Sequence, residues 1–245
     1  MKRDIPFKFD QSSDLGRWRA ETFWEKEPET IAWIESFNRK QLTNLDFIDI
    51  GANLGIYSLF ALTTGFFRRV IAVEPMPINF SQLKTNISLN HFEERSVLYS
   101  QPLYSRALLA NFKFEDKRVG ASGGQVIAVP SDVPADKKTL VQCLTGDDII
   151  DSNYVDSCVI KLDVDGLELE ILKGFEKALA QEVVLSVLVE ATTQNMNDIV
   201  KFMSTYSLIL DSRFDSIENH STKRRIVSGN TERNLIFSKK SNVLF

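Results

Sequence analysis

Short apolar runs alternate along this chain with segments in which apolar residues recur every three or four positions. Seven runs are typical of strands: 47–50, 69–74, 96–100, 157–163, 183–190, 207–211 and 234–238. Helical spacing follows most of them, at 55–66, at 78–90, beyond Gly166 and at 195–206. Such alternation predicts an α/β fold, a doubly wound, seven-stranded Rossmann-like sheet with helices on both faces.

Two stretches interrupt this alternation. Residues 1–46 precede the first core strand and are rich in Trp and Phe, so we expect an N-terminal helical extension that packs on the core and over the mouth of a ligand cleft. The core domain then spans 47–245. Within it, residues 104–146 combine apolar positions with several glycines, which predicts a β insertion rather than a crossover helix. Insertions beside strand ends often shape substrate-specific surfaces.

Composition narrows the class of protein. The 245 residues are 43% hydrophobic and 25% charged, which is ordinary for one globular domain. A net charge of −4 and a pI near 5.4 argue against broad nucleic-acid binding. Two cysteines, Cys143 and Cys158, are too few for a disulfide framework or a zinc site. No apolar run reaches the length of a membrane span, and no apolar signal core follows Met1, so we expect a cytoplasmic protein.

The run Phe47-Ile-Asp-Ile-Gly-Ala-Asn-Leu-Gly55 joins the first strand to the first helix. It reads D-x-G-x-N-x-G, whereas a dinucleotide fingerprint would read G-x-G-x-x-G. The carboxylate of Asp49 would repel a pyrophosphate and attract a cationic group. We therefore expect a nucleoside that carries an amine, with S-adenosylmethionine as the candidate. The alternative is an ordinary strand–turn–helix in which the glycines only punctuate a loop.

A second acid ends the next strand. Glu74 follows Arg69-Val-Ile-Ala-Val73, and a carboxylate at this point of a doubly wound sheet accepts hydrogen bonds from ribose hydroxyls. This role suits a nicotinamide enzyme as well as an adenosylmethionine enzyme. An exposed strand-end carboxylate without a ligand is the alternative.

Several motifs together resemble one family. Asp-Ile-Gly-Ala-Asn-Leu-Gly at 49–55, Val-Glu-Pro at 73–75, Asn86, Lys-Leu-Asp-Val-Asp-Gly-Leu-Glu at 161–168 and Val189-Glu190 are similar to the FkbM family of S-adenosylmethionine-dependent methyltransferases. The lead-in Trp24-Glu-Lys-Glu-Pro-Glu-Thr30 is also similar, so the resemblance spans about residues 24–238. It implies a class I methyltransferase sheet and O-methylation of a hydroxyl on a small-molecule, sugar or glycolipid-type acceptor.

Two positions depart from the family pattern. Asp-Val-Asp-Gly at 163–166 stands where the family usually has Asp-Val-Glu-Gly, so its acid is one methylene shorter. Thr145-Gly-Asp-Asp148 stands where the family has Thr-Leu-Asp-Asp, which removes an apolar anchor. Neither change removes a cofactor residue, but both bear on the acceptor.

The resemblance also implies a cofactor site. Asp49 would lie near the methionine amine, directly or through water, and Glu74 would bind the ribose. Gly51 and Gly55 would let the backbone approach the ligand, and Asn53 would hold the loop or the methionine carboxylate. Ser100 and Gln101 would meet the adenine, and Asp163 would lie beside the methyl donor.

Methyl transfer to a hydroxyl needs alignment and a proton acceptor. Like charges packed together would raise the pKa of one carboxyl, so we predict Asp163 or Asp165 as the base and Glu190 or Glu168 as the orienting group. The alternatives are that Glu168 caps the following helix and that Glu190 pairs with Lys161. His91 and His220 are more readily explained as solvated histidines. No compact acidic arrangement suggests a metal ion.

Three classes of function compete on this sequence. The first is the O-methyltransferase just described. The second is a methyltransferase of protein or nucleic-acid nitrogen, disfavoured by the acidic pI and by the absence of an Asn/Asp-Pro-Pro-Tyr motif. The third is a cofactor-binding scaffold without activity. The sequence indicates neither the acceptor's identity nor the oligomeric state.

Overall fold

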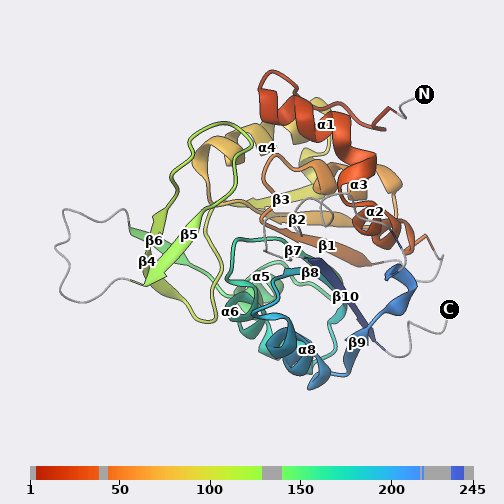
Figure 1. Cartoon of the computed structure of the whole chain (residues 1–245), viewed down its shortest axis with the longest axis vertical. Coiled ribbons are helices and arrows are strands. Elements are labelled where there is room, and N and C mark those ends of the chain that lie inside the picture. Colours follow the sequence, from red (N-terminus) through yellow and green to blue (C-terminus); the bar gives the residue numbers. More distant parts are fainter. Residues whose placement is uncertain (1–3, 39–43, 129–139, 216, 218–232, 240–245) are drawn as a thin grey trace.

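Figure 1 shows a computed structural model of the chain, which describes residues 4–38, 44–128, 140–215, 217 and 233–239. Among these residues, no helix is both long enough and apolar enough to cross a membrane. A single large sheet forms the centre, and a smaller sheet projects from one end of it (Figure 1).

The large sheet contains the seven predicted strands in the order β3-β2-β1-β7-β8-β10-β9. Their bounds are β1 Leu45–Ile50, β2 Arg69–Val73, β3 Ser96–Tyr99, β7 Ser157–Leu162, β8 Val184–Ala191, β9 Leu208–Leu210 and β10 Arg233–Lys239. The first five of the order pair in parallel, and β10 runs antiparallel to both of its neighbours. The predicted doubly wound sheet is therefore confirmed. From β1, the strands β2 and β3 follow on one side and β7 and β8 on the other.

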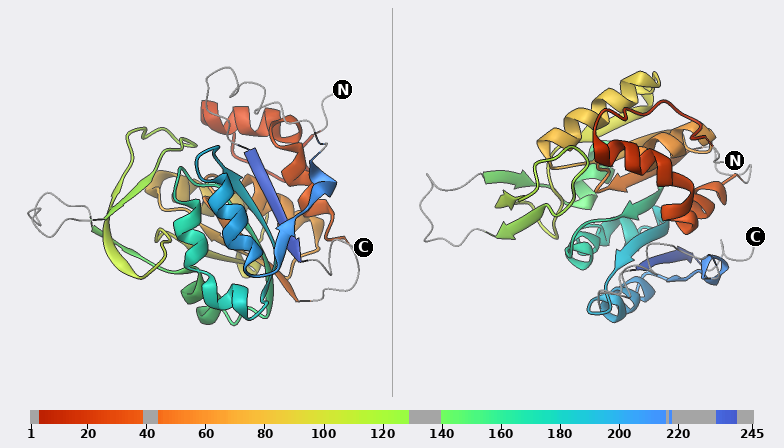
Figure 2. Two further views of the ribbon diagram at one scale, coloured as in Figure 1. Left: turned by 60° about the horizontal axis from the view of Figure 1, so that its bottom comes forward. Right: turned by 45° about the horizontal axis from the view of Figure 1, so that its top comes forward.

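Helices cover both faces of this sheet, as Figure 2 shows. On one face lie α1 Asp14–Lys26, α2 Pro28–Glu35, α3 Ile56–Thr64 and α4 Pro77–Leu89. On the other lie α5 Gly146–Ser152, α6 Glu168–Lys173, α7 Glu176–Ala180 and α8 Met196–Ser204. Since the strands alternate their side chains between these faces, each face has its own hydrophobic core.

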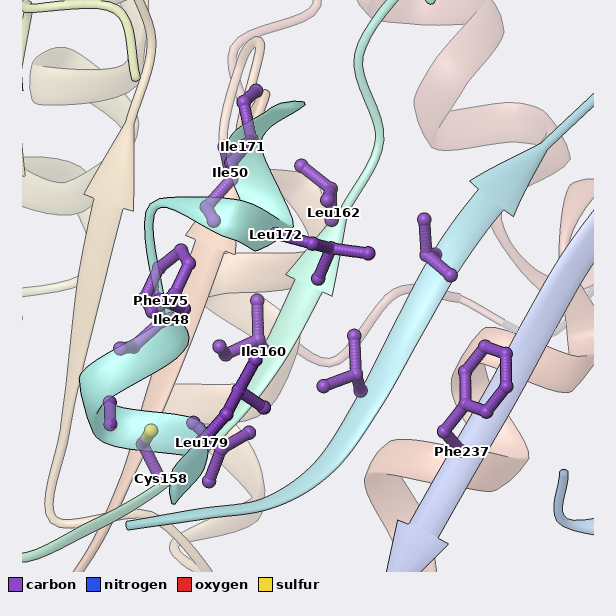
Figure 3. Close-up of a cluster of buried hydrophobic side chains, with 14 of the residues drawn as sticks. Ile48, Ile50, Cys158, Ile160, Leu162, Ile171, Leu172, Phe175, Leu179 and Phe237 are labelled. Carbon is purple, nitrogen blue, oxygen red and sulfur yellow. The ribbon is translucent and has the colours of Figure 1, made fainter. Parts of the chain in front are cut away.

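The core beneath α5 to α8 is built from every second residue of the central strands (Figure 3). Ile48 and Ile50 of β1 meet Ile160 and Leu162 of β7, and Phe175 between α6 and α7 covers them (Figure 3). Cys158 lies in the same core as a buried free thiol, where it packs as a small hydrophobic side chain.

The N-terminal helices belong to the opposite core. Trp33 of α2 is fully buried and donates a hydrogen bond from Nε1 to Ser186 Oγ of β8 at 2.9 Å. Phe23 of α1 packs edge-on against Phe60 of α3. At about 25 cal/mol per Å² of apolar area, such burial anchors both helices firmly to the sheet. Phe23 and Trp33 are therefore part of the hydrophobic core on this face of the sheet.

The described residues of the segment 104–146 form three antiparallel strands, β4 Leu108–Lys113, β5 Gln125–Ala128 and β6 Leu140–Cys143, in the order β5-β4-β6. They form the small sheet that projects in Figure 1. The loop between β4 and β5 returns toward α1 and α4, where Gly120 accepts a hydrogen bond from Arg19 Nη2. This loop brings the insertion to the ends of the core strands.

One element differs from the sequence prediction. The apolar spacing from Ile171 to Leu179 predicted one helix, but the structure has two, α6 and α7, that break at Gly174. The Gly174 carbonyl accepts a hydrogen bond from Asp147 N at 2.8 Å, and the Asp147 carboxylate accepts from the backbone N–H groups of Lys177 and Ala178. Because α5 supplies these partners, a second helix can begin where the first ends.

Candidate active site

A cavity of about 140 Å³ opens at the carboxyl ends of β1, β2, β7 and β8, the edge at which open α/β sheets bind ligands. Its walls come from α1, the loop after β1, the loop after β2, the insertion and the loop after β7. The lining residues are Arg19, Lys26, Gly51, Ala52, Asn53, Leu54, Ile56, Tyr57, Glu74, Pro75, Met76, Phe112, Ala121, Ser122, Gly123, Gly124, Lys161, Asp163, Val164, Asp165 and Glu190.

The two glycines after β1 satisfy backbone and packing requirements. Gly51 has φ +79°, and a Cβ placed on it would lie 2.0 Å from the carbonyl oxygen of Asp163. Gly55 has φ +80° at the start of α3, and its Cβ would lie 2.3 Å from Leu83 of α4. Gly51 lines the cavity, whereas Gly55 is not among the lining residues. Its smallness therefore lets α3 and α4 approach each other.

Glu74 sits where the sequence placed it, at the end of β2 on the cavity wall. Its two carboxylate oxygens accept hydrogen bonds from the backbone N–H groups of Asn53 at 2.7 Å and Met76 at 2.8 Å. Burial raises the pKa of Glu74 to about 7, against the lowering effect of these two hydrogen bonds. Each oxygen keeps a further lone pair for a hydroxyl donor.

Asn53 holds the loop rather than projecting into the cavity as a free side chain. It adopts φ 53°, and its Nδ2 donates to the carbonyl of Ala121 at 2.8 Å. Asn79 of α4 donates to the same carbonyl at 2.9 Å and accepts from Gly120 N at 2.8 Å. The segment from Arg118 to Gly124, which we call the strap, is thus tied to the loop after β1 and to α4 across one side of the cavity.

Asp49 is placed beneath the cavity. Its side chain is almost fully buried and accepts a hydrogen bond from Ser58 Oγ at 2.6 Å. Within the described part of the chain its Oδ1 has no hydrogen-bond partner. Burial raises the pKa of Asp49, although Lys161 and Ser58 lower it. Asp49 is not among the lining residues, so contact with a ligand amine would have to pass beside Gly51.

Lys161 and Asp163 form the central ion pair of the site. Lys161 Nζ lies 2.8 Å from Asp163 Oδ2, and its side chain is 2% exposed, against 29% for that of Asp163. Burial alone would raise the pKa of Asp163, but Lys161, aided by Lys26 and by a hydrogen bond with Glu190, lowers it below its ordinary value. The sequence argument expected like charges to raise it. The buried ammonium, which that argument did not weigh, reverses the direction.

The remaining predicted residues fall into two groups. Glu190, at the end of β8, and Asp165 line the cavity beside Asp163. Glu168 lies outside this lining, and its carboxylate accepts from Gly166 N and Asn195 Nδ2, both at 2.9 Å, which favours its alternative role at the start of α6. Ser100 and Gln101 are exposed and are not among the lining residues.

The two histidines take no part in the described site. His91 is exposed at the end of α4 with φ 57°. His220 lies outside the described residues.

The two departures from the family pattern have local explanations. A Cβ on Gly146 would lie 2.2 Å from the ring of Phe175, so the aromatic ring occupies the space of the missing apolar anchor. Thr145 and Asp148 still form a capping box at the start of α5. The shorter acid, Asp165, accepts a hydrogen bond from Gly123 N at 2.6 Å and so ties the strap to the loop after β7.

The sequence argument missed several lining residues. Arg19 and Lys26 belong to the N-terminal segment that we expected over the mouth of the cleft, but no sequence signal singled out these two residues. None singled out Tyr57 of α3 either. Lys161 did have one, because a lysine inside the apolar strand Cys158–Leu162 must find a partner if the strand is buried. Its partner could not be chosen from the sequence, which suggested Glu190 where the structure shows an ion pair with Asp163.

The comparison with protein families was decisive. The family model described as "Methyltransferase FkbM domain" matches residues 49–217, well over half of the chain. The chain belongs to the FkbM methyltransferase family. Its sheet, with a last strand antiparallel inside an otherwise parallel order, is the seven-stranded Rossmann-like sheet of class I methyltransferases.

A curated relative matches at low identity. It is the hexuronic acid methyltransferase AglP of Haloferax volcanii, 26% identical over 161 residues, which are 65% of this chain and 62% of the relative. This FkbM family member thus spans less than two thirds of the relative's length.

Solved structures resemble the fold. The METTL16 MTase domain matches with a TM-score of 0.46 at 13% identity, over 85% of this chain and 65% of that chain. M. capricolum TrmK, solved with S-adenosyl-homocysteine, matches with a TM-score of 0.42 at 9% identity, over 85% of this chain and 68% of the other. At these identities the likeness concerns the fold alone.

Proposed function

We propose that this FkbM family member is an S-adenosylmethionine-dependent methyltransferase that O-methylates a hydroxyl of a small-molecule, sugar or glycolipid-type acceptor. One observation carries the proposal, namely the cavity at the ends of β1, β2 and β7 that holds Glu74 on one side and the Lys161–Asp163 pair on the other. The relative named as a hexuronic acid methyltransferase supports the sugar class of acceptor.

The residues present fit the cofactor. Glu74 is fixed by two backbone donors and keeps lone pairs for ribose hydroxyls. Asp49 carries a buried oxygen without a hydrogen-bond partner among the described residues, close to the turn at Gly51, which suits a cationic amine held directly or through water. Ser100 and Gln101 do not support an adenine contact, since both are exposed away from the cavity lining.

When bound, S-adenosylmethionine would supply an electrophilic methyl group. The acceptor oxygen would take this group, and the electron pair of the broken bond would remain on sulfur. Asp163 accepts the hydroxyl proton. A low pKa does not prevent this, because the oxygen becomes strongly acidic as it gains the methyl group. What matters is that the carboxylate is ionised and in place. Glu190 orients the hydroxyl from the neighbouring strand, and Phe112 offers an apolar face for a sugar ring.

The test begins with cofactor binding and ends with transfer. We expect calorimetry to register binding of adenosylhomocysteine, and methyl-labelled adenosylmethionine to pass label to a hexuronic acid or a glycolipid fraction. Replacing the base, Asp163→Asn, should reduce kcat by about 10² to 10⁴ while adenosylhomocysteine still binds. The matched control is Lys173→Met on the surface of α6, whose ammonium pairs only with nearby Glu170 among the interactions described.

Other outcomes would replace the proposal. Label that passes to RNA or to protein nitrogen would establish the second class of function. Cofactor binding without any transfer would favour a scaffold. Near wild-type transfer by both Asp163→Asn and Glu190→Gln would refute the catalytic assignment while leaving the methyltransferase activity intact.

A further inference from the structure

Lys161 is the least expected charged group near the cavity. It lies in the middle strand β7, in register with Asp49 of β1 and Leu188 of β8. Its side chain is 2% exposed. A lysine in such a place is costly unless anions surround it, since removing an ammonium from water costs several kcal/mol. The buried Lys161 ammonium beside the cavity therefore calls for a structural or functional explanation.

Acidic residues from several packed elements lie near this ammonium. The charged and titratable groups that face Lys161 and Asp163 are Asp49 from β1, Glu27 and Lys26 from the end of α1, Tyr57 from α3 and Glu190 from β8. Lys161 Nζ also lies 4.9 Å from the centre of the Tyr57 ring, a cation–π contact. Burial would lower the pKa of Lys161, but Asp163, Asp49 and Glu27 raise it, so the ammonium stays charged.

The Lys161–Asp163 ion pair also has a defined geometry. Lys161 contacts the Asp163 carboxylate directly, with Nζ and Oδ2 2.8 Å apart. Lys161 is the second-last residue of β7, and Asp163 directly follows the strand, two positions along the chain. Lys161 points from the closed side of the cavity and Asp163 opens to it. The ammonium therefore holds Oδ2 of a carboxylate that stays partly exposed on the cavity wall.

We propose that Lys161 is a positioning residue for methyl transfer, because its buried ammonium keeps the Asp163 carboxylate ionised and oriented toward the acceptor hydroxyl. This inference rests on the proposed function. Lys161 does not touch the reacting atoms and acts through Asp163. It also links the N-terminal segment to the reaction, since Glu27 at the junction of α1 and α2 helps to balance the same ammonium.

The first measurement needs no acceptor. In protein labelled with ¹³C at the aspartate carboxyls, the Asp163→Asn variant identifies the Asp163 resonance. In the wild type we expect this carboxyl to titrate below the ordinary value of 3.8. In Lys161→Met it should titrate about one to three units higher, as expected on losing an adjacent opposite charge. An ordinary or raised pKa in the wild type would overturn the inference, and so would an unchanged pKa in Lys161→Met.

The second measurement uses transfer. We expect Lys161→Met to lower kcat at least about tenfold, to move the acid limb of its pH profile upward, and to leave the adenosylhomocysteine Kd unchanged. Lys161→Arg, which keeps the charge, should leave the acid limb in place. Lys173→Met serves as the matched control. A double variant with Asp163→Asn should lose little more than Asp163→Asn alone, whereas multiplied losses would show that Lys161 acts elsewhere.

Two further outcomes are decisive. If Lys161→Met does not fold, the inference is tested by the titration of Asp163 in the wild type and by the pH profile of Lys161→Arg. If the wild type binds adenosylhomocysteine and Asp163 titrates low, but no acceptor is methylated, then the pairing stands and the proposed function fails, together with the catalytic role of Lys161.

Discussion

Two aspartates three residues apart on β1 have contrasting surroundings. Asp46, at the start of the strand, is fully buried and accepts four hydrogen bonds from Arg68 and Arg69, at 2.6 to 3.1 Å. Asp49, near its end, accepts one from Ser58 and has an oxygen without a described partner. Both oxygens of the Asp46 carboxylate accept hydrogen bonds, whereas one oxygen of the Asp49 carboxylate has no partner among the described residues. This difference separates a structural acid from one that suits a ligand.

The same contrast holds for the two edges of the sheet. At the amino ends of the strands, the arginines that reach Asp46 are partly exposed and close the edge with ion pairs. At the carboxyl ends, Glu74, Asp163, Asp165 and Glu190 line a cavity. The glycine turn at Gly51 leaves room at this second edge, and the strap covers one side of it. The acids therefore face a space that a ligand can fill.

Among the substitutions that test this contrast, Asp46→Asn should have the largest effect, on the stability of the fold. Removing the charge breaks several charge-assisted hydrogen bonds, so the free energy of unfolding should fall by about 2 to 3 kcal/mol. Urea denaturation would measure it. Methyl transfer per folded molecule should be unchanged. The matched control is Asp151→Asn, since the Asp151–Lys177 pair is well exposed and should contribute at most about 1 kcal/mol. Equal losses in both variants would contradict the distinction.

Glu74→Gln should act on the ligand instead of the fold. Losing the ionised acceptor of two hydroxyls should weaken adenosylhomocysteine binding about tenfold or more, measured by calorimetry. Methylthioadenosine, which has the same ribose, should lose as much. Unchanged binding of either ligand would contradict the ribose role.

The pH dependence of the wild type tests the same carboxyl. The pKa of Glu74 is raised to about 7, mainly by burial. Its contribution to folding stability is therefore complete below about pH 4.5 and is lost as the pH rises through 7. Ligand affinity should change with the opposite sign, weakening as the pH falls below 7, because hydroxyls donate best to the ionised form. Calorimetry between pH 5.5 and 8.5 measures this slope, which Glu74→Gln should abolish.

Asp49→Asn should have a smaller and more selective effect. The amide removes the attraction for an amine, so adenosylhomocysteine should bind about fivefold more weakly, or 1 kcal/mol. Methylthioadenosine lacks the amino-acid part with its α-ammonium group and should bind as before. Stability should hold, because the carboxylate it replaces is poorly paired. Equal losses for the two ligands would show that Asp49 supports the loop and does not meet the amine.

The smallest effect should come from Asp165→Ala. It removes the hydrogen bond from Gly123 N, so the strap should open more readily, by about 0.5 to 1.5 kcal/mol, in amide hydrogen exchange. Methyl transfer should fall less than tenfold. A loss of a hundredfold or more with adenosylhomocysteine binding retained would instead make Asp165 the base.

Much of the fold was accessible from the sequence. Apolar runs located all seven strands of the large sheet to within two residues, because burial on two faces leaves a strong local pattern. Glu74 was found for the same reason, since a strand end is local information. The break between α6 and α7 was not found, because it depends on Asp147 and Gly174, which are distant in sequence and adjacent in space.

The site was accessible only in outline. The edge that carries the acids follows from parallel strands, and Asp163, Asp165 and Glu190 line the cavity at that edge. Ser100 and Gln101 were expected at the cavity and are exposed instead. The direction of the pKa shift at Asp163 depended on which cation came within 3 Å, and sequence spacing alone could not choose between possible partners of Lys161.

By itself, the sequence determined that this chain forms a doubly wound sheet with acids at the carboxyl edge, because strand burial and turn chemistry are set by neighbouring residues. Only the tertiary structure decided which charges pair, which carboxylate oxygen lacks a hydrogen-bond partner and which loop covers one side of the cavity. Ion pairs and hydrogen bonds depend on distances of a few ångströms between residues far apart in the chain, such as Asn53 and Ala121, and folding alone sets those distances.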